Sequence, residues 1–322
     1  MIIDVFSHIL PPKYWAAACN KYNTIAEGWI VSSPSLIDLD ARFRAMERHP
    51  EVLQVLTTTT PPALEALITP ADSVEFARMA NDEMAELIVK YPDKFAGAVA
   101  CLPLDNMDAA LEETDRAITK LGLKGVQLNA SLFGDHLGHP KYRPLYEKMV
   151  HYNSPIWIHP FNSPQLDSEK SLNPIEVLPY GLFAWPLATG INMMNLVTEG
   201  IFNDYPDIKF ITHHCGGVVP LLEGRITWLY NGAFPVGHPA RTWKEHFRKF
   251  YNDTACCGTT SALMCGYDFF GADHILFGTD VPFPPFGLTL ETIDSVRRMG
   301  ISDAEKEKIF SRNAIKLLNI PT

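Results

Sequence analysis

Four polar side chains each follow an apolar run, at a point where a buried strand would end. They are His8, His159, His214 and Asp280. Imidazole nitrogens and carboxylate oxygens are common ligands of catalytic zinc, and a carboxylate can also accept a proton from metal-bound water. In a parallel barrel the carboxyl ends of all strands meet at one face, which carries the active site. Three histidines and one aspartate at four strand ends therefore predict a metal hydrolase or lyase site.

Two of these residues have a plainer alternative explanation. Asp280 follows Ile275-Leu-Phe-Gly-Thr279 and lies shortly before Pro282, so its carboxylate could instead cap a turn. His159 ends the run Ile156-Trp-Ile-His159, and a lone histidine at that point could instead close the end of the barrel core. The functional interpretation is favoured because comparable residues end other strands.

The third strand end carries two adjacent histidines, His213 and His214. They precede Cys215-Gly-Gly217, whose glycines allow a sharp turn into the next helix. Successive residues of a strand face opposite sides, so we expect only one histidine to face the site. The pattern His-x-Gly-Gly selects His214, and we expect His213 to be packed outside the site or hydrogen bonded.

The first strand departs from a familiar metal-binding pattern. Many barrel metallohydrolases end this strand in His-x-His, because alternate residues share one face. Here Phe6 stands two residues before His8, and a phenylalanine cannot bind a metal ion. Either the site works with three protein ligands and water, which is the ordinary form of catalytic zinc, or metal binding is weakened or lost.

Three other residues are weaker candidates. His136 and His139 lie in a Gly-rich loop after the fourth strand, where polar residues more often serve only the loop. Arg225 follows the Gly-Gly turn on a helix. An arginine there usually makes a salt bridge, but it could bind a substrate carboxylate, especially across a dimer interface.

Apolar runs alternate with helical patterns along the chain. The expected strands lie near Ile2–Val5, Val52–Thr57, Phe95–Cys101, Gly125–Leu128, Ile156–His159, Lys209–Thr212, Phe250–Asp253 and Ile275–Gly278. The expected helices lie near Leu39–Glu47, Ser73–Lys90, Asp108–Leu121, Pro140–Tyr152, Ala188–Asn203, Val218–Tyr230, Thr260–Phe270, Asp303–Phe310 and Arg312–Leu318. This alternation predicts an α/β fold, a (β/α)8 barrel formed by one domain of residues 1–322.

A doubly wound sheet is the rival fold, but it usually has a Gly-rich turn after strand one. This chain has Phe6-Ser-His-Ile-Leu-Pro-Pro12 at that place. Two segments at the expected carboxyl face are long enough to be inserted loops, Pro11–Ser35 after strand one and Pro160–Pro186 after strand five. Long loops at this face usually form lids and substrate walls.

Composition excludes several kinds of partner. The chain has 322 residues, of which 47% are hydrophobic and 20% charged, and its formal net charge is −10. It has no basic stripe and no apolar run of transmembrane length, so we expect neither nucleic acid nor membrane as a partner. Six cysteines without a CxxC pair, and no signal peptide, predict free thiols in a cytoplasmic protein.

The motifs, taken in order, resemble those of the amidohydrolase-related (amidohydrolase 2) decarboxylases, most of all the aminocarboxymuconate-semialdehyde decarboxylases. The resembling pieces are Ile3-Asp-Val-Phe-Ser-His-Ile-Leu-Pro11, Tyr91-Pro-Asp-Lys-Phe95, Leu102-Pro103, Gly125-Val-Gln-Leu128, His159-Pro160, His214-Cys-Gly-Gly217, Gly224-Arg-Ile226, Gly278-Thr-Asp-Val-Pro-Phe-Pro284 and Ser311-Arg-Asn-Ala314. The resemblance covers essentially the whole chain.

This resemblance implies one divalent metal, with zinc first and manganese or magnesium as alternatives. It maps metal ligation onto His8, His159 and Asp280, and proton handling onto His214. It also implies a dimer in which Arg225 reaches the neighbouring subunit's site. The segment Trp29–Asp38 lacks the arginine with which the muconate-semialdehyde decarboxylases bind substrate, which argues for a different substrate.

The leading interpretation is a carboxy-lyase, a metal-dependent and non-oxidative decarboxylase of a small aromatic or unsaturated carboxylic acid. His214 and Asp280 would manage protonation of the carbon that loses CO₂, Phe6 would line the pocket, and no organic cofactor is needed. A metal-dependent hydrolase or hydratase would use the same residues. A third alternative is a non-catalytic subunit that pairs with an active paralogue in a hetero-oligomer instead of a homodimer.

Overall fold

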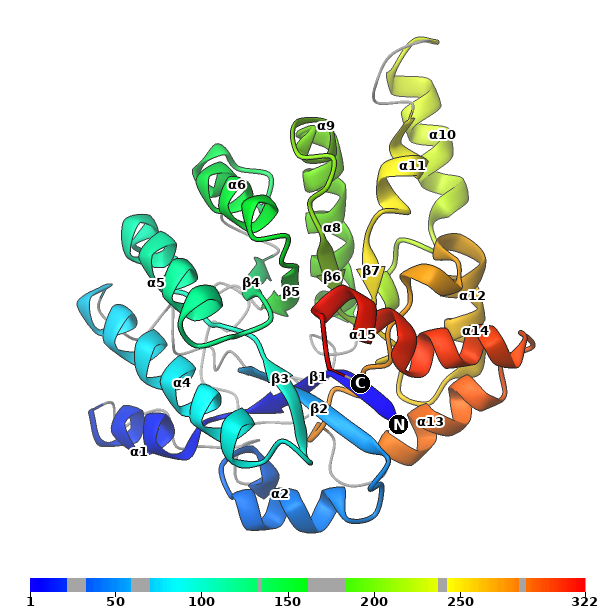
Figure 1. The fold of residues 1–322 in the computed structure, drawn as a ribbon. Coiled ribbons are helices and arrows are strands. Elements are labelled where there is room, and N and C mark those ends of the chain that lie inside the picture. The colour runs from blue at the N-terminus through cyan, green and yellow to red at the C-terminus, as the bar shows by residue number, and fades with distance from the viewer. Residues whose placement is uncertain are drawn as a thin grey trace.

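The computed structural model describes residues 1–21, 33–58, 70–131, 135–161, 183–236, 242–283 and 288–321. The fold is a (β/α)8 barrel, with parallel strands at the centre and helices around them (Figure 1). The strands are β1 (Ile2–Ile9), β2 (Val52–Thr58), β3 (Phe95–Ala98), β4 (Val126–Ser131), β5 (Ile156–Phe161), β6 (Phe210–Thr212) and β7 (Tyr251–Asn252). They form two hydrogen-bonded groups, β1-β2-β3 and β4-β5-β6-β7.

Bridges outside the named strands close the two groups into a barrel. Ala100 pairs with Val126 between β3 and β4, and on the other side Asn252 pairs with Ile275 and Ser7 with Val281. The segment around Ile275 therefore occupies the eighth strand position. The expectation of a regular strand over Ile275–Gly278 is wrong, however, because this segment forms single bridges and no ladder.

Side-chain bonds add to the few backbone bonds that tie the eighth segment to its neighbours, among them those from the Leu276 N–H to the Asn252 carbonyl and from the Val5 N–H to the Phe277 carbonyl. The Oγ1 of Thr254 accepts a hydrogen bond from the Gly278 N–H at 3.0 Å and donates one to the Gly278 carbonyl at 2.9 Å. On the opposite side, buried Asp4 accepts hydrogen bonds from the Thr279 N–H at 3.1 Å and from its hydroxyl at 2.5 Å. Burial raises the pKa of Asp4 to about 6, although these hydrogen bonds oppose the shift.

A register shift in β1 lies between Asp4 and Ser7. Two residues, Val5 and Phe6, occupy the shifted stretch, as in a β-bulge, which re-aims side chains near an active site. Beyond it the pairing resumes, with His8 opposite Thr57 of β2. The bulge therefore sets where Phe6 and His8 lie at the end of the strand.

The main helices follow the expected alternation. They are α1 (Pro12–Lys21), α2 (Leu39–Met46), α4 (Pro70–Lys90), α5 (Met107–Thr119), α6 (Arg143–His151), α8 (Trp185–Thr198), α9 (Ile201–Asp204), α10 (Glu223–Ala233), α11 (Trp243–Phe247), α12 (Thr260–Phe270), α13 (Leu288–Arg297), α14 (Asp303–Glu307) and α15 (Asn313–Leu318). The expected helix Ala188–Asn203 is divided, because Gly200 adopts a left-handed φ of 73° between α8 and α9. None of the described helices combines the length and apolar character that a membrane crossing requires.

The two expected insertions are described only in part. The first contains helix α1, whose Tyr14 and Trp15 are buried against Phe76 of α4. Residues 22–32 of this insertion, and 162–182 of the insertion after β5, lie outside the described residues. The wall and lid function expected of these loops therefore stays a prediction.

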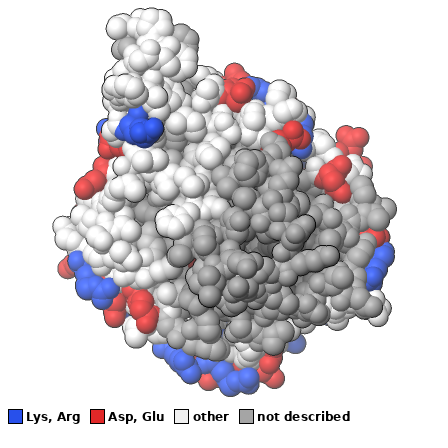
Figure 2. Space-filling view, turned by 180° about the vertical axis from the view of Figure 1, so that it is seen from behind, with Lys and Arg blue, Asp and Glu red and all other residues white. Residues whose placement is uncertain are grey.

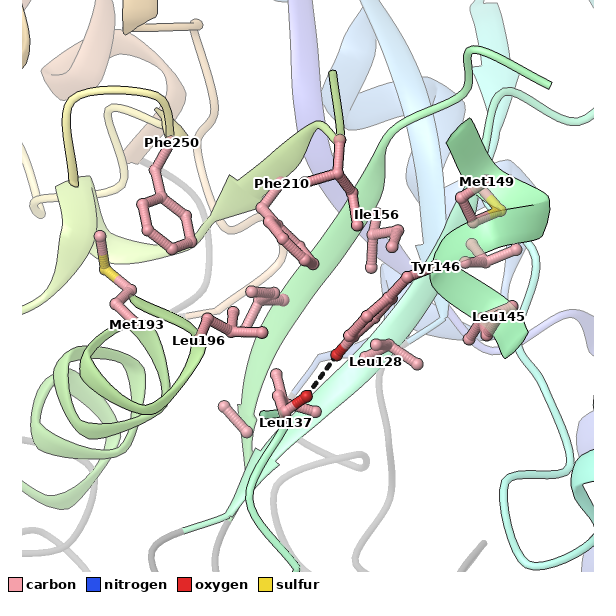
Figure 3. Close-up of a cluster of buried hydrophobic side chains, with 14 of the residues drawn as sticks. Leu128, Leu137, Leu145, Tyr146, Met149, Ile156, Met193, Leu196, Phe210 and Phe250 are labelled. Atoms are coloured by element: carbon pink, nitrogen blue, oxygen red, sulfur yellow. Dashed lines mark hydrogen bonds between the residues drawn. The ribbon is translucent and has the colours of Figure 1, made fainter. Parts of the chain in front are cut away.

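An apolar core fills the space between the strands and the outer helices. Figure 3 shows part of it, where side chains from β4, β5 and β6 meet those of α6 and α8. Ile156 and Phe210 are fully buried, and each such side chain contributes roughly 1.5–3 kcal/mol of burial free energy. The one polar atom of Tyr146 is satisfied, because its hydroxyl donates to the Leu137 carbonyl. This packing holds β5, and with it His159, in a fixed position.

Candidate metal centre and active site

Five side chains meet at the carboxyl ends of β1, β5, β6 and the eighth segment. They are His8, His159, His213, His214 and Asp280. One donor atom from each of His8, His159 and His213 lies within 4.8 Å of the others, and the same holds for His213, His214 and Asp280. The sequence-predicted residues are thus brought together, and His213 joins them as a member of both groups.

His8 is held from two sides. Its ring Nδ1 lies 3.1 Å from the Thr57 hydroxyl, and its backbone carbonyl accepts a hydrogen bond of 2.7 Å from buried Arg42. The other ring nitrogen, Nε2, faces Asp280 at 3.1 Å. The ring of His159 stands edge-on to that of His8, with centroids 4.9 Å apart. This support fixes the direction in which Nε2 points.

His213 is hydrogen bonded as expected, but it does not lie outside the site. Its Nδ1 bonds to the buried carboxylate of Asp253, and its Nε2 lies 3.2 Å from Asp280. The strand alternation does not apply here because β6 ends at Thr212. His214 and Cys215 then adopt left-handed φ values of 55° and 53°, and both histidine rings reach the site.

Asp280 stands at the centre of the cluster. Its own φ is 62°, and its backbone N–H donates to the Phe6 carbonyl at 3.1 Å. One carboxylate oxygen faces His8 and His213, and the other lies 3.7 Å from Nε2 of His214. Burial favours the neutral acid, but the charge of His213 and the closeness of three histidine rings outweigh it. The pKa of Asp280 therefore lies well below its usual value.

The histidines differ in charge state. Burial lowers the pKa of His8, and Asp280 only partly opposes it. Burial, together with the charges of His8 and His213, places the pKa of His159 well below its usual value. Burial and the charge of His213 also lower the pKa of His214. In contrast, the carboxylates of Asp253 and Asp280 outweigh burial at His213 and raise its pKa to about 10.

The donor set fits a divalent metal ion. Four buried ring nitrogens have no hydrogen-bond partner among the described residues, namely His8 Nε2, His159 Nδ1, His213 Nε2 and His214 Nδ1. Buried polar atoms are normally hydrogen bonded, so several orphaned nitrogens beside one carboxylate call for a ligand. Neutral imidazole and an ionised carboxylate are the forms that bind zinc and related ions, so His213 would have to release its proton to bind one.

Phe6 lies against the cluster. Its side chain is fully buried, and its ring stacks on that of His213 with centroids 4.1 Å apart and planes at 22°. The rings of His8 and His159 are 6.0 and 6.4 Å away. The position two residues before His8 therefore does face the cluster, and an apolar ring fills it.

Other candidates lie elsewhere. His139 accepts a hydrogen bond from the Lys141 N–H and so caps a short helix, and His136 packs near it. Arg225 is exposed on α10, and no described hydrogen bond or ion pair involves its side chain. Neither group belongs to the two donor sets of the cluster.

Sequence reasoning missed several residues that support the cluster, among them Asp253 and Thr57. One carboxylate oxygen of Asp253 is hydrogen bonded to Nδ1 of His213. The other oxygen accepts hydrogen bonds from the backbone N–H groups of Cys215 and Ala255, at 3.2 and 3.0 Å. Thr57 supports His8. Asp253 could have been found, because it ends the expected strand Phe250–Asp253 just as Asp280 follows the next one. Thr57 carries no such signal, because a threonine within an apolar strand is ordinary.

Comparison with known proteins shows which chains are similar. The amidohydrolase family model matches residues 3–320. A gamma-resorcylate decarboxylase from Rhizobium sp. (strain MTP-10005) is 31% identical over 306 residues, which are 91% of this chain and 90% of the relative. A 2-amino-3-carboxymuconate-6-semialdehyde decarboxylase from Dictyostelium discoideum is 27% identical, over 99% of this chain and 91% of the relative.

Solved structures of two decarboxylases match this chain over almost its full length. A 2,6-dihydroxybenzoate decarboxylase complexed with 2,6-dihydroxybenzoate has a TM-score of 0.81 and 27% identity, and 99% of each chain is covered. A dihydroxybenzoic acid decarboxylase from Polaromonas sp. JS666, with bound manganese and the inhibitor 2-nitroresorcinol, has a TM-score of 0.80 and 26% identity. That match covers 99% of this chain and 96% of the other.

Proposed function

The chain belongs to the amidohydrolase family, and from this premise we propose that it is a metal-dependent, non-oxidative decarboxylase of a hydroxylated aromatic acid. The observation that carries the proposal is the cluster itself, in which orphaned histidine nitrogens surround one ionised carboxylate. Relatives named for gamma-resorcylate and 2,6-dihydroxybenzoate support an aromatic substrate with a hydroxyl beside its carboxylate. The match over residues 3–320 supports one functional domain.

We propose that His8, His159 and Asp280 hold the metal. A bound divalent ion would stabilise the negative charge on the substrate carboxylate and on the carbon that loses it. Histidine nitrogens and one carboxylate are typical zinc ligands, so zinc is our first choice, and manganese is the alternative because a relative holds it. No organic cofactor is required, since the aromatic ring of the substrate accepts the electrons of the broken C–C bond.

His214 and Asp280 are placed to handle the proton. Loss of CO₂ leaves an electron pair on the ring carbon, and one proton must replace the carboxyl group there. Asp280 is ionised and its oxygen lies 3.7 Å from Nε2 of His214, whose side chain is 17% exposed. His214 can therefore exchange protons with solvent on one side and with the reacting carbon or Asp280 on the other.

Aromatic rings close the floor of the site. Phe6 is fully buried under His213, and the ring of Phe283 lies 5.8 Å from that of His8. We propose that Phe6 keeps water away from the metal and from the face of the planar substrate. Exclusion of water strengthens the electrostatic pull on the developing charge.

The active form, we propose, is a homodimer joined through α8 and α10. These helices contact each other through Tyr230, whose hydroxyl lies 3.1 Å from that of Thr198. Large apolar side chains are exposed along them and the adjoining chain, namely Phe183, Trp185, Leu187, Ile191, Leu221, Trp228, Leu229 and Val236. Figure 2 shows the protruding α10 region as largely uncharged, and such patches mark protein interfaces. Arg225 lies on the same helix and would reach the partner's pocket.

The direct test is release of CO₂ from a panel of hydroxybenzoates and unsaturated acids by the zinc- or manganese-loaded protein. We expect activity that a chelator abolishes and that the added metal restores. Hydrolysis of esters or amides without CO₂ release would favour the hydrolase alternative, and absence of metal after loading would favour a non-catalytic subunit. A cytoplasmic location, which the six free cysteines support, is part of the proposal.

A further inference from the structure

His213 occupies a position in the cluster that the proposed function does not yet use. It is the member common to both groups of donor atoms, and only one of its two nitrogens is engaged by a hydrogen bond. We propose that His213 is itself a ligand of the metal, in place of the ligand that Phe6 cannot supply. This inference rests on the proposed metal-dependent function and assigns one more residue to it.

The ring of His213 is oriented as a metal ligand requires. Its Nδ1 is tied to Asp253, so Nε2 is the nitrogen that remains for a metal. That Nε2 and the Nε2 of His8 lie 3.2 and 3.1 Å from the same oxygen of Asp280. The two imidazoles and the carboxylate therefore converge from three directions.

Asp253 makes the orientation rigid. It is fully buried, and its second oxygen is held by two backbone N–H groups, those of Cys215 and Ala255. A metal-binding histidine almost always donates its other ring N–H to a carboxylate or carbonyl, which fixes the ring and raises its basicity. His213 and Asp253 have this arrangement, whereas the Nδ1 of His214 has no partner among the described residues.

Phe6 explains why the fourth metal ligand would come from the end of β6 and not from β1. Its ring stacks on that of His213, with centroids 4.1 Å apart, and fills the inward position of β1, next to His8. Without a ligand from that position, the metal would have three protein ligands, His8, His159 and Asp280. His213 brings the protein ligands to four, and the stacking of Phe6 holds the new ligand in place.

A different role for His213 makes the opposite prediction. In that role it is a cation that bridges Asp253 and Asp280 and never touches the metal. Replacing it by a neutral residue would then remove a positive charge beside the site, and metal affinity would stay the same or rise. If His213 is a ligand, the same change removes a metal bond, and affinity falls.

The experiment measures zinc affinity by competition with a chromophoric chelator for the full-length wild type and for His213→Gln, with His214→Gln as the matched neighbour. We expect His213→Gln to weaken zinc binding about 10²-fold or more, and His214→Gln to change it by less than about threefold. We also expect Asp253→Asn to weaken it roughly 10-fold to 100-fold. Unchanged or tighter binding by folded His213→Gln overturns the inference.

A measurement on the wild type guards against variants that fail to fold. X-ray absorption of the zinc-loaded protein should show three imidazole ligands, and two would overturn the inference. If the wild type binds zinc and releases CO₂ but shows only two imidazoles, the inference fails and the proposed function stands. If the wild type binds no zinc or manganese at all, both fail.

Discussion

His213 and His214 are neighbours in sequence, yet their surroundings push their protonation in opposite directions. The carboxylates of Asp253 and Asp280 raise the pKa of His213 to about 10, whereas burial and the charge of His213 lower that of His214. Two side chains of one type are therefore separated into a charged and a neutral form by position alone. Such divergence is characteristic of catalytic sites.

The raised pKa of His213 predicts how the metal-free protein responds to pH. A group whose folded pKa lies above its unfolded value of 6.5 stabilises the fold fully below pH 6.5. That contribution is lost as pH rises from 6.5 towards about 10. We expect the melting temperature of the metal-free wild type to fall across this range, and that of His213→Gln to fall less. Equal slopes for the two proteins would show that His213 is not charged in the folded state.

The position of Phe6 yields a second residue-level prediction. In Phe6→His an imidazole would face the cluster where the phenyl ring now stacks on His213. We expect metal affinity to rise, because a further ligand is added, and decarboxylation to slow, because an open coordination position or an apolar contact is lost. Chelator competition and CO₂ release measure the two effects.

A matched Phe6→Leu variant keeps the side chain apolar, so its affinity for the metal should not rise. If Phe6→His changes neither metal binding nor turnover, Phe6 does not act at the site.

At the scale of elements, the eighth segment shows what periodicity could and could not reveal. The apolar run Ile275–Phe277 correctly indicated a place in the barrel, because the three residues are fully buried. The absence of a regular ladder could not be foreseen, since it depends on Thr254 and Asp4, which lie far away in sequence and bond to Gly278 and Thr279. Local patterns carry no information on such long-range side-chain bonds.

Helix α13 was not expected either, and the reason is again tertiary. Its sequence contains β-branched residues, among them Thr292, Ile293 and Val296, which lower helix propensity. Burial of Ile293 and Val296 against Phe277 compensates for that weakness. By contrast, helix α12 matched its expected bounds Thr260–Phe270, because Gly271 follows with a φ of 78° and ends it.

The side-chain bonds of Thr254 should be measurable in stability. In Thr254→Val the N–H and carbonyl of Gly278 lose their partner while the side-chain volume is kept. Because these groups are buried, we expect a loss of about 1–3 kcal/mol in the free energy of unfolding. Chemical denaturation measures it.

The control is Thr227→Val on α10, where the hydroxyl only bonds back to Glu223 within the helix. That change should stay within about 0.5 kcal/mol. An equally small effect at Thr254 would mean that its side-chain bonds to Gly278 do not stabilise the closing segment.

At the scale of the whole molecule, the proposed dimer makes a sharp prediction about Arg225. His214→Ala and Arg225→Ala should each be poorly active, the latter mainly through a raised KM for the acidic substrate. When the two variants are unfolded, mixed and refolded, half of the dimers combine one subunit of each kind. If Arg225 serves the partner's site, each mixed dimer has one complete site and about one quarter of wild-type activity returns.

No recovery, with dimers present in sedimentation, would show that Arg225 acts within its own subunit or not at all. Arg297→Ala is the matched control, since Arg297 is exposed and pairs with Asp294 on α13. When Arg297→Ala is mixed with His214→Ala, activity should come only from the sites of the Arg297→Ala subunits. The dimer expectation came from a family resemblance, because a single sequence does not reveal which exposed apolar residues form a patch.

The closure of the barrel has a consequence for the order of events during synthesis. Asp280 follows His8 by 272 residues in the sequence, yet their side chains are 3.1 Å apart where β1 meets the eighth segment. During synthesis on the ribosome, the histidines of the cluster are therefore made well before Asp280, whose carboxylate completes it. We therefore expect the proposed metal to bind only after Asp280 has been synthesised, and a truncated chain that lacks Asp280 to bind it weakly.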